Sequence, residues 1–498
     1  MAKKFTSACC LPNKIVKVLN QMIWANKIPV ASRLFNIIRF ALGAGGVALL
    51  GSGGCRPAIA ETLPPLDIHR APDQKVVLSW PEQATDTVLE QSAGLAAENT
   101  WQPVSESPAL ANGTYALALE ASAPRQYYRL QDTNTAAITE VRIVPVPDGA
   151  LVPDVMVDKA GAVHMVYGLN NNAYYERSTH NGASFSPPVK VNSTGTVVTT
   201  MGERGPKLAV GADGVIHVVW ADQWKPGVEV YVRYARSLDG GKSFGPRQTV
   251  SSMPGVDGTT MTVDRAGNVL VFWHVMVSPP PAVPQATWVH MARSTNNGAN
   301  FAANEKVQTT NLAGIACSMC LMRARCDADG EVCLAFRNAE GNVRDFYLLK
   351  GASTKNDFRA LRINQDNWII DYCPMCGPEL TLDPNGRAIC AFMSRNKAYW
   401  AISDNPVTGF NLHVATPANE PNEIYPSAYA NRRGEVLFVW QVGPMSTSGT
   451  AQVKWALYRN DGTFTGQQAT VGTSFSGTKA TAFVGTDDDF YLVTSAKP

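Results

Sequence analysis

A strand-turn-strand pattern recurs along the second part of this 498-residue chain, and it constrains the fold more than any other feature. In each copy an apolar strand enters a tight turn that ends in glycine, and a second strand leaves the turn and ends near an aromatic residue. Glycine suits these turns because they require a positive φ. The copies are PDVMVDKAGAVHMVY, PKLAVGADGVIHVVW, TTMTVDRAGNVLVFW, MRARCDADGEVCLAF, PELTLDPNGRAICAF and PSAYANRRGEVLFVW, with turn glycines Gly161, Gly214, Gly267, Gly330, Gly386 and Gly434. Such a repeat predicts an array of equivalent β-sheets.

A second motif follows each hairpin at a nearly constant interval. Residues 237–244 read SLDGGKSF and residues 294–301 read STNNGANF, while residues 178–185 read STHNGASF and depart from the pattern only at His180. Weaker copies follow, and the six motifs end at phenylalanines that lie 52 to 59 residues apart: Phe185, Phe244, Phe301, Phe358, Phe410 and Phe464. The motif resembles the Asp-box, or BNR repeat, of the sialidase-like β-propellers. Because its Asp or Asn caps a turn, the motif indicates a fold and not an activity.

The resemblance implies an all-β, sialidase-like β-propeller of six or seven blades over residues 138–498. The stretch TKATAFVGTDDDFYLVT near the C-terminus reads as a seventh hairpin. With EVRIVPV at residues 140–146 it would form a last blade built from both ends of the domain. Closure of this kind removes exposed strand edges.

Residues 61–135 predict a separate small β-module. The segments VVLSWP, TVLEQS, TYALALEA and QYYRLQ alternate apolar and polar residues, with turn residues between them. We expect Trp80 and Trp101 in its core. The pattern resembles a fibronectin type III-like sandwich, and DTNTAAITE reads as the linker that follows it.

Residues 1–60 read as an export leader. Lysines and arginines precede the apolar run FALGAGGVALL at residues 40–50, which is short for a membrane span and favours a cleaved signal over an uncleaved anchor. Cleavage after Ala60 would follow an A-x-A site, whereas Cys55 resembles a lipoprotein acylation site without the usual aliphatic residue three positions earlier. We expect a periplasmic or extracellular protein, lipid-anchored if Cys55 is acylated. A net charge of +2 argues against a nucleic-acid partner.

Two Cys-x-Met-Cys clusters lie one repeat apart: Cys317 and Cys320 in ACSMCLMRA, and Cys373 and Cys376 in DYCPMCGPEL. Each cluster precedes the first strand of a hairpin. Repeat symmetry therefore places the two clusters as neighbours, on the face that carries the ligand site in the sialidase-like family. We expect the same face to hold Glu203, Arg204, His274, Arg323, Arg337, Glu379, Glu423 and Tyr425.

Three interpretations of the four cysteines stay open. An oxidising compartment favours disulfides within or between the two loops. Four thiolates could instead form a zinc site, and thiolates together with Met319, Met322 or Met375 would favour Cu(I). A redox dithiol is the third interpretation, although these motifs open strands, whereas a low thiol pKa is often obtained at a helix N-terminus.

The other cysteines have structural interpretations. Cys326 and Cys333 flank one hairpin turn symmetrically, so we expect them to face each other as a disulfide or as two buried thiols. Cys390 reads as a small buried hydrophobe. The region from 317 to 400, with AFRN, VRDFY, DNWII and CPMCGP, also resembles a group of uncharacterised bacterial sialidase-like proteins. In VRDFY we expect Arg344 and Asp345 to form a local ion pair.

The sialidase resemblance also implies a catalytic set: an arginine triad for the substrate carboxylate, a Tyr–Glu nucleophile pair and an aspartic acid/base. Tyr425 lies where the family nucleophile is expected, with Glu423 close by. Arg204, Arg323 and Arg337 could supply guanidinium groups, although ordinary ion pairs explain them equally well.

Departures from the sialidase pattern outweigh these matches. The Arg-Ile-Pro motif of the family is replaced by RIVP at residues 142–145, and the extra residue turns Arg142 to the opposite face of a strand. The acid is matched only by position, at Asp154 or Asp222. We therefore predict an exported binding propeller for a carbohydrate or protein ligand, with a disulfide or a Cu or Zn centre. A glycoside hydrolase-like enzyme of the sialidase superfamily is the alternative.

Overall fold

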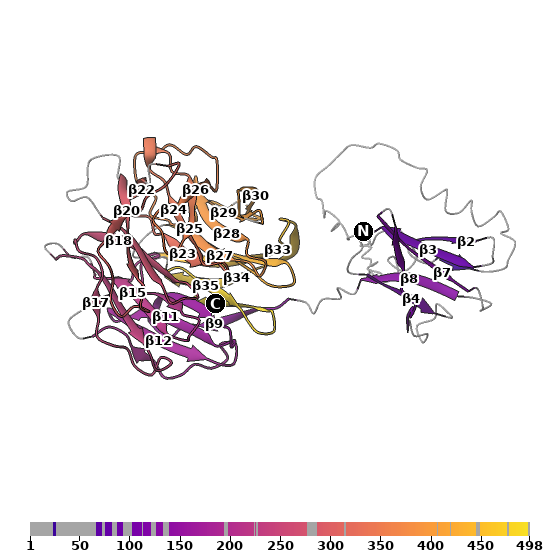
Figure 1. Ribbon diagram of the computed structural model, residues 1–498, viewed down its shortest axis with the longest axis horizontal. Helices are drawn as coiled ribbons and strands as arrows, with labels where there is room; N and C mark the ends of the chain where they lie inside the picture. Colours follow the sequence, from indigo (N-terminus) through magenta and orange to yellow (C-terminus); the bar gives the residue numbers. More distant parts are fainter. Residues whose placement is uncertain are drawn as a thin grey trace, which may run out of the picture. The chain divides into compact units, whose positions relative to one another are not determined.

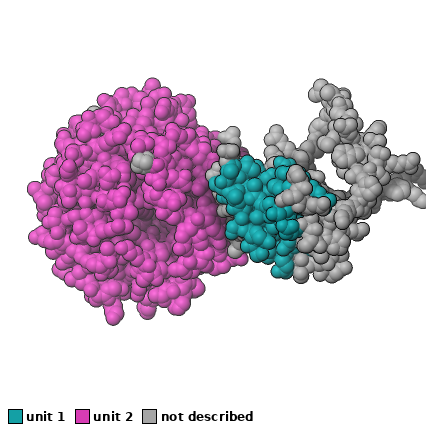
Figure 2. All heavy atoms as spheres, turned by 45° about the vertical axis from the view of Figure 1, so that its right-hand side comes forward, with its two compact units in different colours: residues 1–138 teal, residues 139–498 magenta. Residues whose placement is uncertain are grey.

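The computed structural model of the chain separates into two compact units, residues 1–138 and residues 139–498 (Figures 1 and 2). The structure describes residues 23–25, 66–71, 75–81, 87–92, 102–111, 113–120, 126–132, 139–193, 198–223, 225, 228–275, 286–312, 315–405, 407–418, 420–444, 449–475 and 478–496. The predicted export leader lies outside them, apart from the backbone of strand β1 (Ile23–Ala25). These described residues form strands, turns and one short 3-10 turn at Glu340–Asn342, so the predicted all-β class is confirmed. No helix long and apolar enough to cross a bilayer is found among them.

The first unit contains two four-stranded sheets around one apolar core. One sheet has the order β2 (Asp67–Arg70), β3 (Val76–Pro81), β7 (Thr114–Leu119), β6 (Ala109–Ala111), and the other β1, β8 (Gln126–Asp132), β4 (Thr87–Ser92), β5 (Gln102–Pro103). Every second residue of β3 is buried, as the alternating sequence predicts. Leu78 and Trp80 of β3 consequently pack with Leu89 and Leu130 of the other sheet. Trp101 lies outside the described residues.

The second unit contains six sheets built on one four-stranded antiparallel pattern with its strands in chain order, and the third sheet has a fifth strand, β22 (Ile315–Cys317), which pairs with β20 (Ala286–Ser294). The first three sheets are β10 (Leu151–Val157), β11 (Val163–Leu169), β12 (Asn172–Ser178), β13 (Val189–Lys190); β14 (Lys207–Val210), β15 (Ile216–Ala221), β16 (Val232–Ser237), β17 (Gln248–Thr249); and β18 (Val256–Val263), β19 (Val269–Val275), β20 (Ala286–Ser294), β21 (Glu305–Lys306). The next three are β23 (Arg323–Cys326), β24 (Glu331–Arg337), β25 (Phe346–Ala352), β26 (Arg359–Arg362); β27 (Glu379–Leu382), β28 (Ala388–Ser394), β29 (Lys397–Ser403), β30 (Phe410–Ala415); and β31 (Glu423–Ala430), β32 (Glu435–Val442), β33 (Thr450–Arg459), β34 (Phe464–Phe475).

A seventh sheet joins the two ends of this unit. It consists of β35 (Thr481–Val484), β36 (Phe490–Thr494) and β9 (Val141–Pro145), which pairs with β36 in parallel. The strands at residues 140–146 and near the C-terminus therefore share one sheet, as the sequence predicts. Contacts between first strands run from β10 through β14, β18, β23, β27 and β31 to β35, and β35 contacts β10. The first strands of the seven sheets thus contact one another in order, and we call the line that they surround the axis.

Each sheet is buried on both faces, and this explains the nearly continuous apolar runs of the second strands. In β24, Val332, Leu334 and Phe336 pack toward the third sheet, whereas Cys333 and Ala335 pack toward the fifth. Alternate side chains of a strand point to opposite faces, so one apolar strand serves two interfaces. Seven such apolar interfaces, one between each pair of successive sheets, include residues of every sheet.

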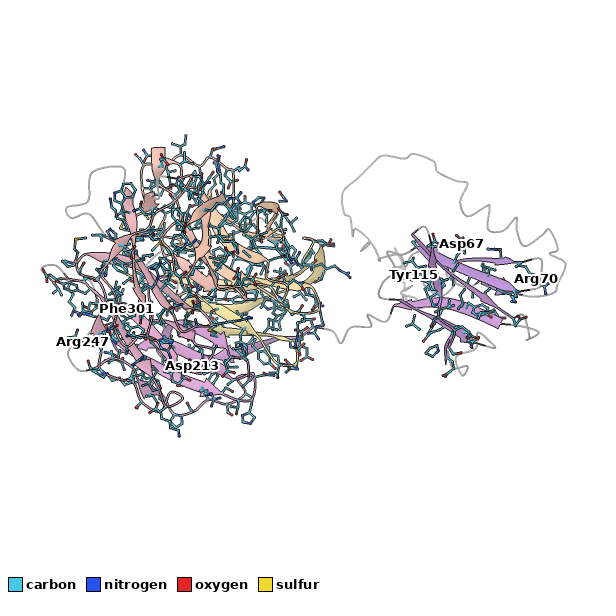
Figure 3. All side chains as sticks on the ribbon, viewed as in Figure 1. Asp67, Arg70, Tyr115, Asp213, Arg247 and Phe301 are labelled. Carbon is cyan, nitrogen blue, oxygen red and sulfur yellow. The ribbon has the colours of Figure 1, made fainter. Side chains whose placement is uncertain are left out.

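Several phenylalanine-ending motifs connect a sheet to the one before it, whereas Phe464 of the last motif is 38% exposed and lies against Tyr458 of its own sheet. Ser237 accepts a hydrogen bond from the Gly241 N–H at 2.9 Å and donates one to Asp239 at 2.7 Å, which closes the turn. In the next sheet Phe301, labelled in Figure 3, lies edge-on to the Tyr234 ring with centroids 4.9 Å apart. The motif therefore orders a turn and packs its phenylalanine against the preceding sheet.

Gly298 of this motif has no room for a larger residue. Its φ is +73°, and an added Cβ would lie 1.7 Å from the Tyr234 hydroxyl, which is hydrogen-bonded to His217 at 2.6 Å. We predict that Gly298→Ala lowers the free energy of unfolding by roughly 3 kcal/mol, because backbone strain and overpacking add. Gly330→Ala is the matched control, since its φ is +83° but nothing lies within 4 Å of the added Cβ, and it should cost about 1 kcal/mol. Urea denaturation measures both variants, and equal losses would contradict the packing argument.

Candidate functional site

The first strands contribute one side chain each to a layer at the axis of the sheets. These residues all occupy the fourth pairing position from the hairpin turn, and they are Asp154, Lys207, Thr260, Arg323, Glu379, Ser427 and Thr481. We call them the axial layer. Arg323 of the fourth sheet forms an ion pair with Asp154 of the first, and such a contact between non-adjacent sheets requires a central position.

Glu379 is a member of the axial layer that contacts two buried cations. Its carboxylate lies 2.7 Å from the Arg323 Nε and 3.2 Å from the Lys479 amine. Burial by itself would raise the pKa of Glu379, but Arg323, Lys479 and Arg325 outweigh it and hold the pKa at about 2. Lys479 also lies 3.6 Å from Glu203, whose other oxygen accepts the Gly377 N–H at 2.6 Å. Glu379 therefore connects Arg323 of the axial layer with Lys479 and Glu203, which lie beside the layer.

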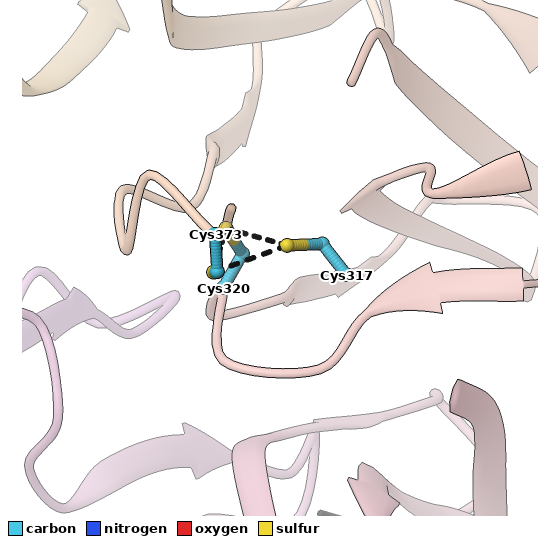
Figure 4. Close-up of side chains that lie close together, drawn as sticks. All are labelled: Cys317, Cys320 and Cys373. Atoms are coloured by element: carbon cyan, nitrogen blue, oxygen red, sulfur yellow. Dashed lines mark hydrogen bonds between the residues drawn. The ribbon is translucent and has the colours of Figure 1, made fainter. Parts of the chain in front are cut away.

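Three of the four predicted cysteines meet beside this layer (Figure 4). Cys317 ends β22 (Ile315–Cys317), which is added to the third sheet through β20. Cys320 follows in a turn, and Cys373 comes from the loop before β27. The Sγ atoms are 3.1 Å apart for Cys317 and Cys373, 3.4 Å for Cys320 and Cys373, and 3.5 Å for Cys317 and Cys320. We call these three residues the thiol cluster.

Cys376 lies apart from the thiol cluster. It packs with Trp368, Met393 and Tyr425, and its sulfur accepts the Tyr425 N–H at 3.4 Å. All seven cysteines from Cys317 to Cys390 carry free thiols. Repeat symmetry thus brings the two loops together, as predicted, but it does not bring all four sulfurs to one point. Trp368 belongs to this apolar cluster and is buried.

The expected pairing of Cys326 with Cys333 is wrong. Cys326 is opposite Val332 and Cys333 is opposite Arg325, so the two thiols point to opposite faces of the sheet. Cys326 packs toward the third sheet and Cys333 toward the fifth. The two cysteines lie at equal distances from the turn in the sequence, and the prediction therefore placed them opposite each other. The hairpin instead pairs each cysteine with the residue that precedes the other cysteine.

Cationic and imidazole side chains hold the two cysteine loops by their carbonyl oxygens. His274 binds the Cys320 carbonyl at 2.8 Å, and Arg204 donates to the Met319 carbonyl at 2.7 Å. Arg337 donates to the Cys376 carbonyl at 2.9 Å. Arg344 donates to the carbonyls of Ala339 at 3.2 Å and Tyr372 at 3.4 Å. The loop backbones on both sides of the thiol cluster are therefore fixed by side chains from several sheets.

The expected local ion pair of Arg344 with Asp345 is also wrong. Asp345 forms its ion pair with Arg362 and accepts the Asn367 N–H at 3.0 Å. Consecutive residues in extended backbone point to opposite sides, so Arg344 turns toward the cysteine loops instead. Its role was missed because sequence adjacency suggested a partner that the strand geometry excludes.

Burial shapes the protonation of the thiol cluster. Hydrogen bonding to Cys320 and burial raise the pKa of Cys317 to about 12, and hydrogen bonding to Cys317 and burial raise the pKa of Cys373 to about 12. Burial raises the pKa of Cys320 well above its ordinary value. Arg337 opposes these shifts for Cys317 and Cys320, so a guanidinium group lies close enough to stabilise thiolates there.

The predicted catalytic residues are buried and engaged. Glu423 is fully buried and accepts hydrogen bonds from Ala398 N–H at 2.8 Å and Thr416 at 2.7 Å. Arg204 makes a two-pronged ion pair with Asp257, with contacts of 2.6 to 3.0 Å. Arg323 belongs to the axial layer. Arg142 turns away to Glu140, Asp487 and Asp489 at the edge of the seventh sheet.

Tyr425 has an unusual backbone. Its φ is +51°, which is rare for a bulky residue, and it lies in a bulge of β31 between Ile424 and Ser427. Its hydroxyl lies 3.0 Å from where a Cβ of Gly202 would stand. Burial first, and then Glu203 and Cys376, raise the pKa of the Tyr425 hydroxyl. The carboxylate near Tyr425 is thus Glu203, and Glu423 is committed elsewhere.

No protein-family model matches the chain, and no curated protein matches it. Similar solved structures include a protein of unknown function from Dyadobacter fermentans, with 15% identity, a TM-score of 0.43, and coverage of 61% of this chain and 94% of the other. An α-L-arabinanase from Penicillium chrysogenum shows 12% identity and a TM-score of 0.42, over 61% and 93% of the two chains. A Hadza microbial sialidase shows 13% identity and a TM-score of 0.39, over 87% and 89%. At these values the chemistry of the site has to be inferred from its own residues.

The matched charges of the axial layer make a prediction about Glu379. We expect Glu379→Gln to lower the free energy of unfolding at pH 7 by roughly 3 kcal/mol, because Arg323 and Lys479 each lose one of their two carboxylate partners and a buried positive charge is left unbalanced. The folded pKa of about 2 lies below the ordinary 4.5, so the wild-type advantage is complete above pH 4.5 and shrinks as pH falls toward 2. Urea denaturation at pH 7 and pH 3.5 measures this loss.

Glu331→Gln is the control for this experiment. Glu331 also forms an ion pair, with Lys350 at 2.5 Å, but its side chain is 43% exposed. Exposed pairs contribute less than about 1 kcal/mol. A Glu379→Gln loss that matched the control, or that did not shrink at low pH, would contradict the charge-matching account.

Proposed function

We propose that the chain is an exported, seven-bladed β-propeller preceded by a fibronectin type III-like module, and that it binds a soft metal ion through Cys317, Cys320 and Cys373. The repeated sheets, the parallel strand that joins β9 to β36 and the contacts around the axis support seven blades. Three buried sulfurs within 3.5 Å of one another support the metal site. Cu(I) and Zn(II) are the ions that thiolate ligands select.

The sulfur positions fit a metal better than a disulfide. A disulfide requires sulfurs about 2.05 Å apart, and none of the three distances comes near that value. Cys317, Cys320 and Cys373 would supply three thiolate ligands to a bound ion, which is the donor set that Cu(I) and Zn(II) favour. Binding releases one proton from each thiol that becomes a ligand.

Metal content of the full chain tests this function. Purified under reductant and loaded with Cu(I) or Zn(II), the wild-type protein should hold about one equivalent after dialysis, and Cys317→Ser should lower its affinity at least about tenfold, because a thiolate ligand is lost. Cys333→Ser is the matched control, since Cys333 is equally buried but faces the fifth sheet. Elemental analysis of both variants and of wild type gives the answer.

Two results would overturn the proposal. One is a mass lighter by two hydrogens for protein purified without reductant, together with no bound metal, which would make the cysteines a structural cross-link. The other is an equal loss of metal in Cys333→Ser and Cys317→Ser, which would place the metal elsewhere. Circular dichroism of each variant shows whether the fold is kept.

A second candidate function is glycoside hydrolysis, and one observation favours it. Tyr425 combines a strained backbone with a neighbouring carboxylate, Glu203, and strain of this kind is concentrated at functional sites. A tyrosine assisted by a carboxylate can act as a nucleophile in glycoside cleavage. A carbohydrate bound at the propeller face is the corresponding ligand.

This second function makes its own prediction. The protein should cleave a fluorogenic sialoside, and Tyr425→Phe should lower the rate by about 10³-fold or more, because the nucleophilic oxygen is gone. Tyr429→Phe is the control, since its buried hydroxyl contacts Thr481 and not Glu203. Absence of turnover by the wild type, or equal rates for the two variants, would rule out a Tyr425 nucleophile.

A further inference from the structure

We infer that the ion held by the thiol cluster is monovalent Cu(I), with Met319 as a fourth, weaker ligand. This inference rests on the proposed function and adds the charge and the kind of the ion. Two independent observations support it: the charge of the side chains around the cluster, and the position of one thioether.

The charge observation concerns Arg337 and Arg344. Their side chains are 1% and 0% exposed, and neither has a carboxylate within 4.0 Å among the residues that the structure describes. Arg337 donates to the carbonyls of Arg344, Cys376 and Met393 and lies over the Phe346 ring. Carbonyls and rings solvate a guanidinium group but do not neutralise it. A buried charge without a counter-charge is unfavourable. Arg337 and Arg344 therefore require two negative charges that no neighbouring carboxylate supplies.

The neighbouring Arg204 is different, because its charge is already matched by Asp257. The missing charges must therefore balance Arg337 and Arg344 only. Three thiolates carry a total charge of −3. With a monovalent ion the site keeps a net charge of −2, which balances the +2 of the two arginines. With a divalent ion the net charge of the site is −1, so one of the two arginines has no counter-charge. Charge balance consequently favours Cu(I) over Zn(II).

The thioether observation concerns Met319. It lies between Cys317 and Cys320 in the chain, and its side chain packs against the buried group formed by the thiol cluster and Ala339. Arg204 fixes the Met319 carbonyl, so the loop presents this residue in a defined place. Thioether sulfur is a ligand for Cu(I), whereas structural zinc sites use Cys, His and carboxylate ligands.

A competition experiment on the full-length protein tests the inference. The reduced protein is titrated with Cu(I) against a chromophoric Cu(I) chelator and with Zn(II) against a chromophoric Zn(II) chelator, and the ratio of the two affinities is the readout. We expect Cu(I) to displace Zn(II) at equimolar metal. Arg344→Gln should lower the Cu(I)/Zn(II) affinity ratio about tenfold. The Cu(I) complex has a net charge of −2 and the Zn(II) complex a net charge of −1, so the Arg344 guanidinium stabilises the Cu(I) complex more.

Arg344→Lys is the matched control, since it keeps the charge and should keep most of the ratio. Met319→Leu should weaken Cu(I) binding and leave Zn(II) binding unchanged, and it tests the same inference where an arginine variant fails to fold. The assignment of Cu(I) would be overturned by a preference for Zn(II), or by an affinity ratio that neither Arg344→Gln nor Met319→Leu lowers. In either case, metal binding that depends on Cys317 would still support a metal site. Failure of both metals to bind would instead overturn the proposed function itself.

Discussion

Burial of every sheet on both faces is the constraint on which the rest of this structure depends. A strand whose two faces are covered can carry polar groups where they find a partner, as Glu176 does in the Tyr167 hydroxyl, or where the sheets stop, at the turns and at the axis. The apolar residues of β24 illustrate this, because successive side chains serve the third and the fifth sheet in turn. Charged groups are thereby gathered into the axial layer and the loops beside it. The position of the chemistry follows from the packing of the scaffold.

The sequence predicted this scaffold well because its signals are local and periodic. Turn glycines such as Gly330 and motif residues such as Phe301 depend on a few neighbouring positions, and their repetition reveals the sheets. Repeat symmetry also placed Cys317 and Cys373 on neighbouring loops, and their sulfurs are 3.1 Å apart. Repeat symmetry therefore predicts the position of a loop to within a few residues.

Side-chain direction within those loops was harder to predict. Glu423 and Tyr425 are two residues apart, which in a regular strand would place them on one face. The bulge at Tyr425 breaks that rule, so Glu423 turns into the interface with the fifth sheet while Tyr425 faces Glu203. A one-residue irregularity reverses a side chain and leaves almost no trace in an apolar-polar pattern.

The axial layer and the thiol cluster differ in how their charges are matched, although the two are neighbours. In and beside the axial layer, Arg323 pairs with Asp154 and Glu379, and Lys479 pairs with Glu203 and Glu379, so these two cations have carboxylate partners. Beside the cysteines, Arg337 and Arg344 have only carbonyls and rings. A fold that supplies carboxylates to one group of buried cations had the means to supply them to the other. The sulfur atoms are the remaining groups that can become anionic, and protonated thiols cannot fulfil that role. A bound cation that turns them into thiolates would complete the electrostatics of this face, so the arginines and the cysteines are best understood as parts of one site.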